Sequence, residues 1–471
     1  RKQTIDIAPD KWQGYARAAR LFLQSSKLKE TEQDRRASLL TLEQQVHRDR
    51  EAHRKRFADN MGKLPIELFG EIARILMMED PAASIILSQV SKHWREVVHN
   101  IPFLWDSLVL TRRRPKQKAK VWLERSKGRI RELVVRSSAL DVPQWSTNLL
   151  DPVQWRYLRV LRVQRWDVAT FLHSIGHATS LKDLEQLELD YSDNSEAWRA
   201  RSLPALSNHL HLRNLTMRGM PLSWATHLTN ITSLRLQSVT CFSGALSDFL
   251  KNNPFLEHLS IETLAVLSDD KDKEDFSLPC LSVLEIKGSY PIFVHTLDFP
   301  KLEVLRVDTP PPGYDSFLQH LVTHSAPALT ELRLTSVQCR GDSIMNLLRI
   351  SPNLQILEVS NTASHATTII EALASPSFSP QTNDIPSSST TSILCPKLTH
   401  VNFSKSPDVQ TGPLVRMIKL RLPPMGAPPA NLEGNFVSRM TSLVIDECPN
   451  VDSNWLPWFR EKVGSSAKFR S

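Results

Sequence analysis

Residues 302–307 read LEVLRV, and residues 329–334 read LTELRL. Each stretch places an apolar residue at its first, fourth and sixth positions. The alternation at positions four to six is typical of a short strand that buries one face. The same pattern occurs twelve times, and we expect one strand at each occurrence. The twelve first positions are Ile130, Leu158, Leu184, Leu212, Ile231, Leu256, Leu281, Leu302, Leu329, Leu354, Leu398 and Met440.

The spacing of these occurrences indicates a stacked repeat. Nine of the eleven intervals are 19 to 28 residues long, close to the 20–29-residue period of leucine-rich repeats. In such repeats each strand joins a parallel sheet, and helical segments return the chain on the outside. Residues 248–250, 317–322 and 344–348 are expected to be helical segments of this kind. The Asn that usually follows each strand is missing, so we expect an irregular array without an Asn ladder.

The two longest intervals, of 44 and 42 residues, have local causes. Residues 373–396 are rich in Ser, Thr and Pro, a composition typical of a low-complexity insertion that buries little apolar surface. Residues 421–431 contain four prolines and are expected to form a second loop. Both segments belong to connections between strands, so a single repeat domain over residues 109–460 is predicted.

The composition is that of a globular protein and excludes several classes. Of the 471 residues, 41% are hydrophobic and 23% are charged, and no apolar run is long enough to cross a membrane. The chain begins at Arg1 without an initiator Met, so we expect a processed or partial sequence. No secretory leader pattern opens it, so secretion is not expected. Five cysteines without a CxxC pair argue against a disulfide framework. The expected location is cytoplasmic or nuclear, without a membrane partner.

Motifs for catalysis and for cofactor binding are missing from the sequence. Glycine is scarce, at 14 residues, and no GxGxxG, GxxxxGKS/T or GxSxG motif occurs. His320 and His324 have a spacing that can bind zinc on a helix, but no third ligand accompanies them. We therefore expect no enzyme activity, no catalytic residue, no metal and no cofactor.

Residues 64–105 differ from the repeats in their sequence pattern. They contain the motifs LPIEL at 64–68, DP at 80–81, VSKHWRE at 90–96 and PFLW at 102–105. Pro65 suits the first turn of a helix, and the Asp-Pro pair marks the start of the next one. Three short helices within about 40 residues cannot bury a large core, yet they carry many large apolar side chains. A surface for a partner is the expected consequence.

This ordered set of motifs resembles an F-box, and more narrowly the F-box-like proteins that are abundant in mushroom-forming fungi. The resemblance covers about 45 of the 471 residues and implies a module over residues 61–108. In that family the module binds a Skp-type adaptor and, through it, the cullin of a ubiquitin ligase. Some of the matching residues must hold the helices together, and Trp94 is the strongest candidate for the core. The residues that the resemblance assigns to adaptor binding are Leu64, Pro65, Ile72, Ile75, Val90 and Trp94.

The predicted architecture therefore has three parts. Residues 1–60 form a polar region rich in helix formers, in which Leu39, Leu42 and Val46 share one helix face. This helix either packs on the next domain or mediates dimerisation. The small three-helix, F-box-like module follows. A leucine-rich repeat solenoid completes an α/β fold, with a parallel sheet on its concave face and helices outside.

The net charge of +8 is concentrated in two segments. Residues 1–63 hold 15 Lys and Arg against 9 Asp and Glu, and residues 112–131 hold ten Lys and Arg against one acid. The basic run at residues 112–118 fits a nuclear-localisation signal, a nucleic-acid contact or a solvated connector. Aromatic residues that would stack on bases do not accompany the run, so a nucleic-acid partner is not expected.

The middle residue of each strand points away from the core and forms an outward column on the concave face. Three members of this column are Arg235, Arg306 and Arg333, and the last two lie in adjacent repeats. Arginine can hold a carboxylate or a phosphate through two hydrogen bonds. We therefore predict that these three residues bind an acidic or phosphorylated segment of an unknown protein substrate.

Other interpretations of the same residues stay open. A face this charged is also consistent with plain solvation, and the neighbouring carboxylates of Glu285, Asp308 and Glu358 would neutralise the arginines. The main hypothesis is a substrate-recognition subunit of a Skp–cullin–F-box type ubiquitin ligase that performs no chemistry itself. The alternatives are a leucine-rich repeat scaffold without a ligase role and a basic, nucleic-acid-associated repeat protein.

Overall fold

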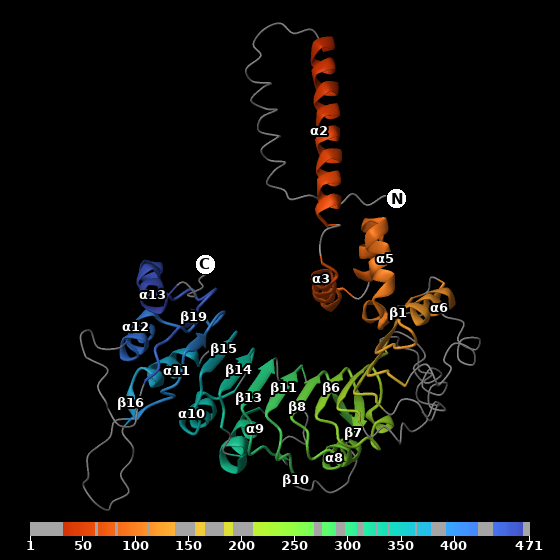
Figure 1. Cartoon of the computed structure of the whole chain (residues 1–471). Coiled ribbons are helices and arrows are strands. Elements are labelled where there is room, and N and C mark those ends of the chain that lie inside the picture. Colours follow the sequence, from red (N-terminus) through yellow and green to blue (C-terminus); the bar gives the residue numbers. More distant parts are fainter. Residues whose placement is uncertain are drawn as a thin grey trace, which may run out of the picture. The chain divides into compact units, whose positions relative to one another are not determined.

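The chain divides between Asn100 and Ile101 into two compact units, whose elements are drawn in Figure 1. Residues 1–31, Leu64 and the central parts of the two expected loops lie outside the described residues. The computed structural model describes residues 32–61, 65–80, 83–111, 114–136, 156–164, 183–191, 211–267, 276–288, 297–308, 314–325, 328–337, 339–362, 365–377, 392–422 and 437–464.

The first unit is helical, and it contains the predicted N-terminal helix and three short helices. Phe69 and Trp94 form its centre, with their rings 4.7 Å apart in an edge-to-face arrangement. Ser91 caps the last helix, because its hydroxyl accepts a hydrogen bond from the backbone N–H of Trp94 at 3.1 Å. Leu42, on the expected apolar stripe of the long helix, is exposed. The helices are α2 (Glu32–Met61), α3 (Ile66–Glu79), α4 (Ala83–Val90) and α5 (Lys92–Asn100).

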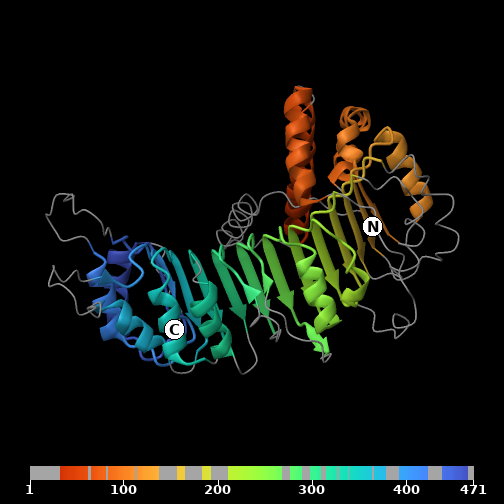
Figure 2. The same cartoon turned by 90° about the horizontal axis from the view of Figure 1, so that it is seen from below.

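The second unit is a solenoid built on one parallel sheet, seen along its strands in Figure 1 and turned in Figure 2. Among the described residues, thirteen strands join this sheet in chain order. Each of the twelve sequence patterns supplies one strand, which confirms the predicted leucine-rich repeat solenoid. The strands are β1 (Ser107–Leu110), β2 (Glu132–Arg136), β3 (Val160–Gln164), β4 (Gln186–Asp190), β5 (Asn214–Arg218), β6 (Ser233–Gln237), β8 (His258–Glu262), β11 (Val283–Lys287), β13 (Val304–Asp308), β14 (Glu331–Thr335), β15 (Ile356–Ser360), β18 (His400–Asn402) and β19 (Ser442–Val444).

The three apolar positions of the pattern form the core of the solenoid. All thirty-six side chains at these positions are buried, and none is more than 4% exposed. Burying one Leu, Ile or Val side chain contributes about 1.5–3 kcal/mol. Because every repeat contributes three such side chains, this column of apolar residues is the main source of the solenoid's stability.

Backbone hydrogen bonds connect each repeat to the next in place of an Asn ladder. The carbonyl of the residue before each strand accepts two N–H groups from the following repeat. Glu303, for example, accepts from Thr330 at 2.8 Å and from Glu331 at 3.1 Å. The same arrangement recurs from Asp106 to Thr399. The backbone N–H groups at this edge of the sheet are therefore hydrogen-bonded without side-chain amides.

A second ladder follows the strands and requires left-handed backbone. Thr263, at φ 55°, donates its N–H to the carbonyl of Lys287 at 2.9 Å, and Gly288, at φ 63°, donates to Asp308 at 3.0 Å. A left-handed residue follows β5, β6, β8, β11, β14 and β15. Most of these positions are not glycine, so the turns carry some backbone strain.

Helices cover much of the outer side of the sheet, as Figure 1 shows. All three predicted helical segments are confirmed: residues 248–250 and 344–348 are α-helical, and residues 317–322 are α-helical to His320 and continue as the π-helix Leu321–Ser325. In the described part of the connection between β11 and β13, the outer element is a short strand. The outer elements are α8 (Ser243–Lys251), β10 (Phe276–Ser277), β12 (Leu297–Asp298), α9 (Tyr314–His320), α10 (Gly341–Arg349), α11 (Ala366–Leu373), α12 (Thr411–Leu420) and α13 (Leu456–Val463).

The solenoid begins earlier than the motifs indicate. Trp105 is buried and packs edge-to-face on Trp122 of α6 (Pro115–Arg125), with ring centroids 4.9 Å apart. The Trp122 indole N–H donates to the buried carbonyl of Ser107 at 2.9 Å. Residues 101–108, which the resemblance assigned to the F-box-like module, therefore lie in the second unit. From Pro115 on, the basic segment forms helix α6, which buries Ala119 and Trp122 and leaves Lys116 and Gln117 exposed.

The expected insertion is ordered at both ends. After α11, β16 (Pro376–Ser377) pairs antiparallel with β17 (Ser392–Ile393). Cys395 is buried, and its carbonyl accepts a 3.0 Å hydrogen bond from Arg421, which is itself buried at the start of the Pro-rich loop. Residues 373–377 and 392–396, at the two ends of the expected insertion, therefore belong to the packed repeat domain. Residues 378–391 and 423–436 lie outside the described residues.

Candidate functional site

The helical module leaves large aliphatic side chains exposed on α3 and α4. In α3, Phe69 and Ala73 are buried, while the neighbouring stripe that contains Ile72 faces outward. Apolar residues cover roughly half of the helix circumference, well beyond the ~100° stripe that buries one face. We call the exposed set the aliphatic face; its members are 39–59% exposed and are Ile66, Leu68, Ile72, Ile75 and Leu76 of α3 with Ile86 and Val90 of α4.

Four of the six residues assigned to adaptor binding are exposed: Pro65, Ile72, Ile75 and Val90. Trp94 instead lies in the core of the module, the role for which it was the strongest candidate. The sixth, Leu64, is outside the described residues. Four exposed members of the aliphatic face had no role in the sequence analysis, and helical periodicity is the signal that identifies them: Ile66, Leu68, Leu76 and Ile86.

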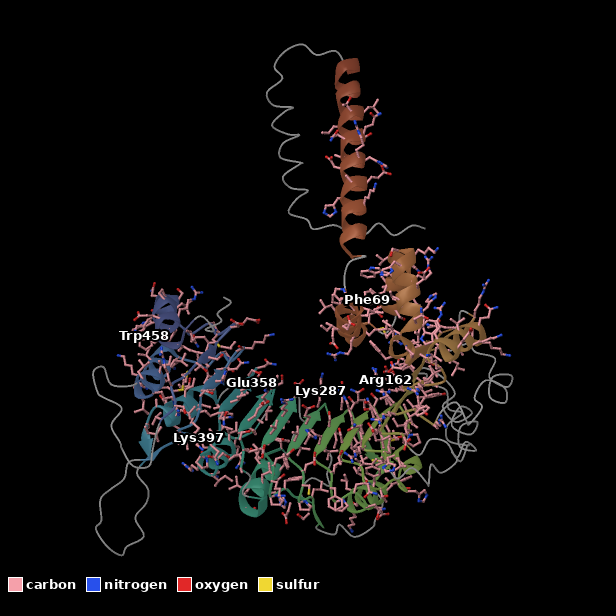
Figure 3. The ribbon with its side chains drawn as sticks, in the orientation of Figure 1. Phe69, Arg162, Lys287, Glu358, Lys397 and Trp458 are labelled. Atoms are coloured by element: carbon pink, nitrogen blue, oxygen red, sulfur yellow. The ribbon has the colours of Figure 1, made fainter. Side chains whose placement is uncertain are left out.

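The concave face of the solenoid carries three outward columns. The first, third and fifth residues of each five-residue strand point away from the core, and neighbouring strands lie about 4.8 Å apart. Arg306 and Arg333 are partners in the register of β13 and β14, so the third column brings them side by side as predicted. Figure 3 labels three further charged residues of this face, Arg162, Lys287 and Glu358.

Arg306 and Arg333 share one carboxylate. Glu331 occupies the first column of β14, and its side chain is only 11% exposed. One of its oxygens, Oε1, lies 2.7 Å from Arg306 Nε and 2.6 Å from Arg333 Nε. Arg306 also donates to Glu285 at 2.5 Å, and Arg333 lies 3.8 Å from Glu358. Both arginines that were predicted to bind substrate are therefore engaged within the chain.

The charge state of this cluster follows from its geometry. Burial would raise the pKa of Glu331, but the hydrogen bond from Arg306 and the charge of Arg333 outweigh burial and lower it. The hydrogen bond to Glu331, followed by that to Glu285, raises the pKa of Arg306. Three carboxylates surround two guanidinium groups, so an acidic ligand would have to displace a carboxylate that is already bound.

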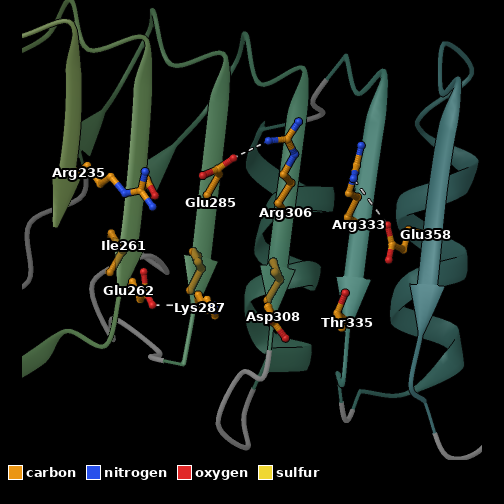
Figure 4. A pocket seen from close by; sticks show the side chains of 13 residues that line it. Arg235, Ile261, Glu262, Glu285, Lys287, Arg306, Asp308, Arg333, Thr335 and Glu358 are labelled. Carbon is orange, nitrogen blue, oxygen red and sulfur yellow. Dashed lines mark hydrogen bonds and ion pairs between the residues drawn. The ribbon is translucent and has the colours of Figure 1, made fainter. Parts of the chain in front are cut away.

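An open hollow of about 310 Å³ lies on the same face, between β6 and β15 (Figure 4). Arg235 reaches from β6 over β8, and within the described residues its side chain forms no ion pair or hydrogen bond. The Asp308 carboxylate, at the end of β13, also lacks a side-chain partner among those residues. Lys287 between them is 3.9 Å from Glu262. Of the three predicted arginines, Arg235 is therefore the one available to a ligand.

Charges in the N-terminal repeats are paired in the same manner. Arg162 of β3 lies 3.2 Å from Glu132 and 3.3 Å from Glu188, one on each side. Arg218 lies 3.7 Å from Asp190 on the neighbouring strand. Cross-strand pairs of opposite charge stabilise a sheet by about 0.2–1 kcal/mol each, so much of the charge on this face has a structural role.

The described residues offer little for catalysis. Within them, no group of three or more His, Cys, Asp or Glu could hold a metal ion. His320 Nε2 lies 3.8 Å from Asp298 Oδ1, and the side chain of His324 is not among those that the structure describes. Burial raises the pKa of the Cys339 and Cys395 thiols to about 12, so neither is a thiolate nucleophile at neutral pH. No helix in the described ranges is long and apolar enough to span a membrane.

Comparisons with known proteins find relatives of the fold only. No protein-family model matches the chain, and no curated protein matches it. Among solved structures, an internalin of Listeria monocytogenes is 13% identical, with a TM-score of 0.34 over 74% of this chain and 76% of the internalin. A leucine-rich repeat protein of Leptospira interrogans is 12% identical, with a TM-score of 0.33 over 72% of this chain and 95% of that protein. The complex of TLR13 with ssRNA13 gives 12% identity and a TM-score of 0.35 over 72% and 46% of the two chains.

Proposed function

We propose that the chain is a two-part interaction protein, the substrate-recognition subunit of a Skp–cullin–F-box type ubiquitin ligase. The helical module would bind a Skp-type adaptor and, through it, a cullin. The concave face of the solenoid would bind the protein to be modified. The chain itself would perform no chemistry, but would raise the effective concentration of the substrate near the ubiquitin-loaded enzyme.

The observation that carries this proposal is the aliphatic face of the module. Seven large aliphatic side chains on two short helices are exposed, although Phe69 and Trp94 already close the core beneath them. Exposed apolar sets of this size on a small helical unit favour a protein partner. The motif order that resembles an F-box supplies the class of that partner.

The solenoid supports the second half of the proposal. Repeat proteins bind partners along a broad, pre-formed sheet surface, and the described part of this sheet extends over thirteen strands. The backbone groups of the inner strands are used in pairing their neighbours. Specificity on this face must therefore come from side chains, which are mostly charged here.

Co-purification tests the adaptor half. The full chain is expressed with a Skp-type adaptor, and the Ile72→Glu with Ile75→Glu variant is compared with the wild type. Two charges on the aliphatic face are expected to abolish capture of the adaptor, because an ionised side chain resists transfer into an apolar interface. Intact helical circular dichroism would show that the module still folds.

A matched control lies on the polar side of the same helix. Arg74 and Glu71 form an exposed ion pair with a 3.0 Å contact, and Glu71→Arg with Arg74→Glu reverses that pair. This variant is expected to capture the adaptor as well as the wild type does. If the wild type captures no adaptor, or if the Ile72 and Ile75 variant captures it undiminished, the ligase role is wrong. The scaffold function, which the repeat fold supports equally, would then be the better interpretation.

A further inference from the structure

We infer that the hollow between β6 and β15 binds an extended peptide segment that carries one acidic and one basic residue about four positions apart. Arg235 would receive the acidic residue, and Asp308 would receive the basic one. This inference rests on the proposed role of the concave face and names the chemistry of the segment bound there. It does not depend on whether the helical module binds an adaptor.

The inference starts from which charges in the hollow are already satisfied. Arg306 and Arg333 are held by Glu331 and by the carboxylates on either side of the pair. Glu262 accepts a 2.9 Å hydrogen bond from Gln237 and lies 3.9 Å from Lys287. Among the described residues that line the hollow, these contacts leave one cation and one anion without side-chain partners.

These two groups are Arg235 and Asp308. The Arg235 side chain is exposed, whereas Asp308 is half-buried at the end of its strand. A ligand of a single charge would meet an attractive group at one end of the hollow and a repulsive group at the other. A segment that carries both charges satisfies both ends at once.

The separation of the two groups sets the spacing of the ligand charges. β6, β8, β11 and β13 are consecutive in the sheet, so Arg235 and Asp308 are three strand spacings apart across the sheet, roughly 14 Å, and two residues apart along the strands, which puts their Cα atoms roughly 16 Å apart. The Arg235 side chain extends over β8, so the two charged groups are closer together than the two Cα atoms. An extended peptide advances about 3.3 Å per residue. Four residues therefore cover this span, and Figure 4 shows the two side chains at opposite sides of the central part of the hollow.

The sheet also determines how the peptide binds. Each strand from β6 to β15 pairs with neighbours on both sides, so the peptide cannot add as another strand within this region. It would cross the strands and bind through its side chains. Ser260, which lines the hollow between Arg235 and the paired carboxylates, offers a hydroxyl to the peptide backbone.

A peptide series on the purified full chain tests the inference. Synthetic Thr- and Gln-rich peptides carry two charged residues separated by one to seven positions, in four combinations: Glu with Lys, Lys with Glu, two Glu, or two Lys. The wild type is expected to bind mixed-charge peptides best at a separation of four, about tenfold tighter than either like-charged pair. A tenfold difference corresponds to about 1.4 kcal/mol.

Two single variants are expected to change the preference for mixed-charge peptides into a preference for like-charged peptides. Arg235→Glu should bind peptides with two Lys best, and Asp308→Lys should bind peptides with two Glu best. Lys419→Glu on α12, an exposed charge on an outer helix, is the matched control and should keep the mixed-charge preference. The order of the charges along the peptide does not matter, because an extended segment can cross the sheet in either direction.

The outcomes separate this inference from the proposed function. If the wild type shows no preference for mixed charge, or if the variants keep the wild-type preference, the inference is wrong. If partner proteins captured by the chain are lost on Arg235→Glu while the peptides follow no charge rule, the concave face is a partner surface with another ligand chemistry. Adaptor capture by the helical module is measured in a separate experiment. It is expected to be the same in the wild type and in the Arg235→Glu, Asp308→Lys and Lys419→Glu variants.

Discussion

The helical module and the solenoid place their aliphatic side chains in opposite environments. In the solenoid, the pattern that builds each strand buries all of its apolar positions, and the outward columns are charged and mostly paired. In the module, a small core around Phe69 and Trp94 is complete, yet seven further aliphatic side chains lie outside it. The solenoid therefore buries its apolar side chains within its own repeats, whereas the module leaves seven exposed, and the proposed adaptor binding rests on this difference.

The largest change in the free energy of unfolding is expected when one aliphatic side chain in each region is truncated to alanine. Leu332 in β14 is fully buried. Leu332→Ala would leave a cavity in the core and should lower the free energy of unfolding by about 3 kcal/mol. Ile75→Ala on the aliphatic face should lower it by less than about 0.5 kcal/mol, because the side chain is already exposed. Urea unfolding followed by circular dichroism gives both values. Equal losses would mean that the module buries this face within the chain.

A buried polar side chain of the solenoid that is fully hydrogen-bonded, Asn253, provides a second test. Asn253 is fully buried at the end of α8, and its side-chain oxygen accepts from Ile231 N–H at 2.8 Å. Its amide donates to the carbonyls of Leu228 at 2.9 Å and Phe249 at 2.8 Å. Asn253→Ala leaves these three backbone groups unpaired and should cost about 2–3 kcal/mol.

Its sequence neighbour is the control for this substitution. Asn252 is exposed and makes one long contact, 3.4 Å to the carbonyl of Thr226. Asn252→Ala should therefore change the free energy of unfolding by less than about 0.5 kcal/mol. A small effect at Asn253 would show that water replaces the amide, and that adjacent repeats do not depend on this side chain.

The repeat pattern predicts the solenoid well because it reflects a local rule. Apolar residues at positions one, four and six bury the same face wherever they occur, so twelve strands could be found from spacing alone. β1 follows the same rule, with Trp105, Leu108 and Leu110 at these positions. It was missed because its first position is aromatic and because the resemblance placed the segment in the module.

The details of the concave face depend on contacts across strands and are harder to predict. Arg306 and Arg333 were expected in adjacent repeats, and Glu285 and Glu358 were expected to compete for them. Glu331 was missed because it lies in the first column, and only the register of the sheet shows that its carboxylate falls between both arginines. Asp308 was expected to neutralise an arginine, but the register places it in the fifth column, beside Lys287.

A pH-dependent prediction concerns the junction where the solenoid begins. Burial, opposed by the charge of Arg131 at 3.9 Å, raises the pKa of Asp106 to about 6. Below about pH 3 the carboxyl is protonated in both the folded and the unfolded state, so it has no effect on stability. As the pH rises toward 6, the unfolded state releases the proton first, and the folded state loses stability.

Asp106→Asn removes this titration. The variant should be more stable than the wild type by about 2 kcal/mol at pH 7.5, and the difference should vanish near pH 3. Urea unfolding at the two pH values measures the change. Arg131→Gln is the matched comparison, because loss of the guanidinium should raise the pKa of Asp106 further and destabilise the chain at pH 7.5. A gain for Asp106→Asn that is independent of pH would contradict this origin.

The smallest change in the free energy of unfolding is expected in the turns that follow the strands of the solenoid, where residues adopt left-handed backbone. Thr263 and Gly288 occupy equivalent positions in adjacent repeats, at φ 55° and 63°. A β-branched residue is disfavoured in this conformation by about 1–2 kcal/mol, whereas glycine adopts it freely at an entropic cost of roughly half that size. Thr263→Gly should therefore stabilise the solenoid by about 0.5 kcal/mol, and Gly288→Ala should destabilise it by about 1 kcal/mol.

The two substitutions should also add. A methyl group at Gly288 would lie 3.5 Å from Thr263 Oγ1, an ordinary van der Waals distance, so removing Thr263 relieves no clash. Thermal unfolding of the double variant should give the sum of the two single changes within about 0.5 kcal/mol. A larger departure would mean that the turns of adjacent repeats shift together. Strain in the second backbone ladder would then be a property of the repeat array rather than of each residue.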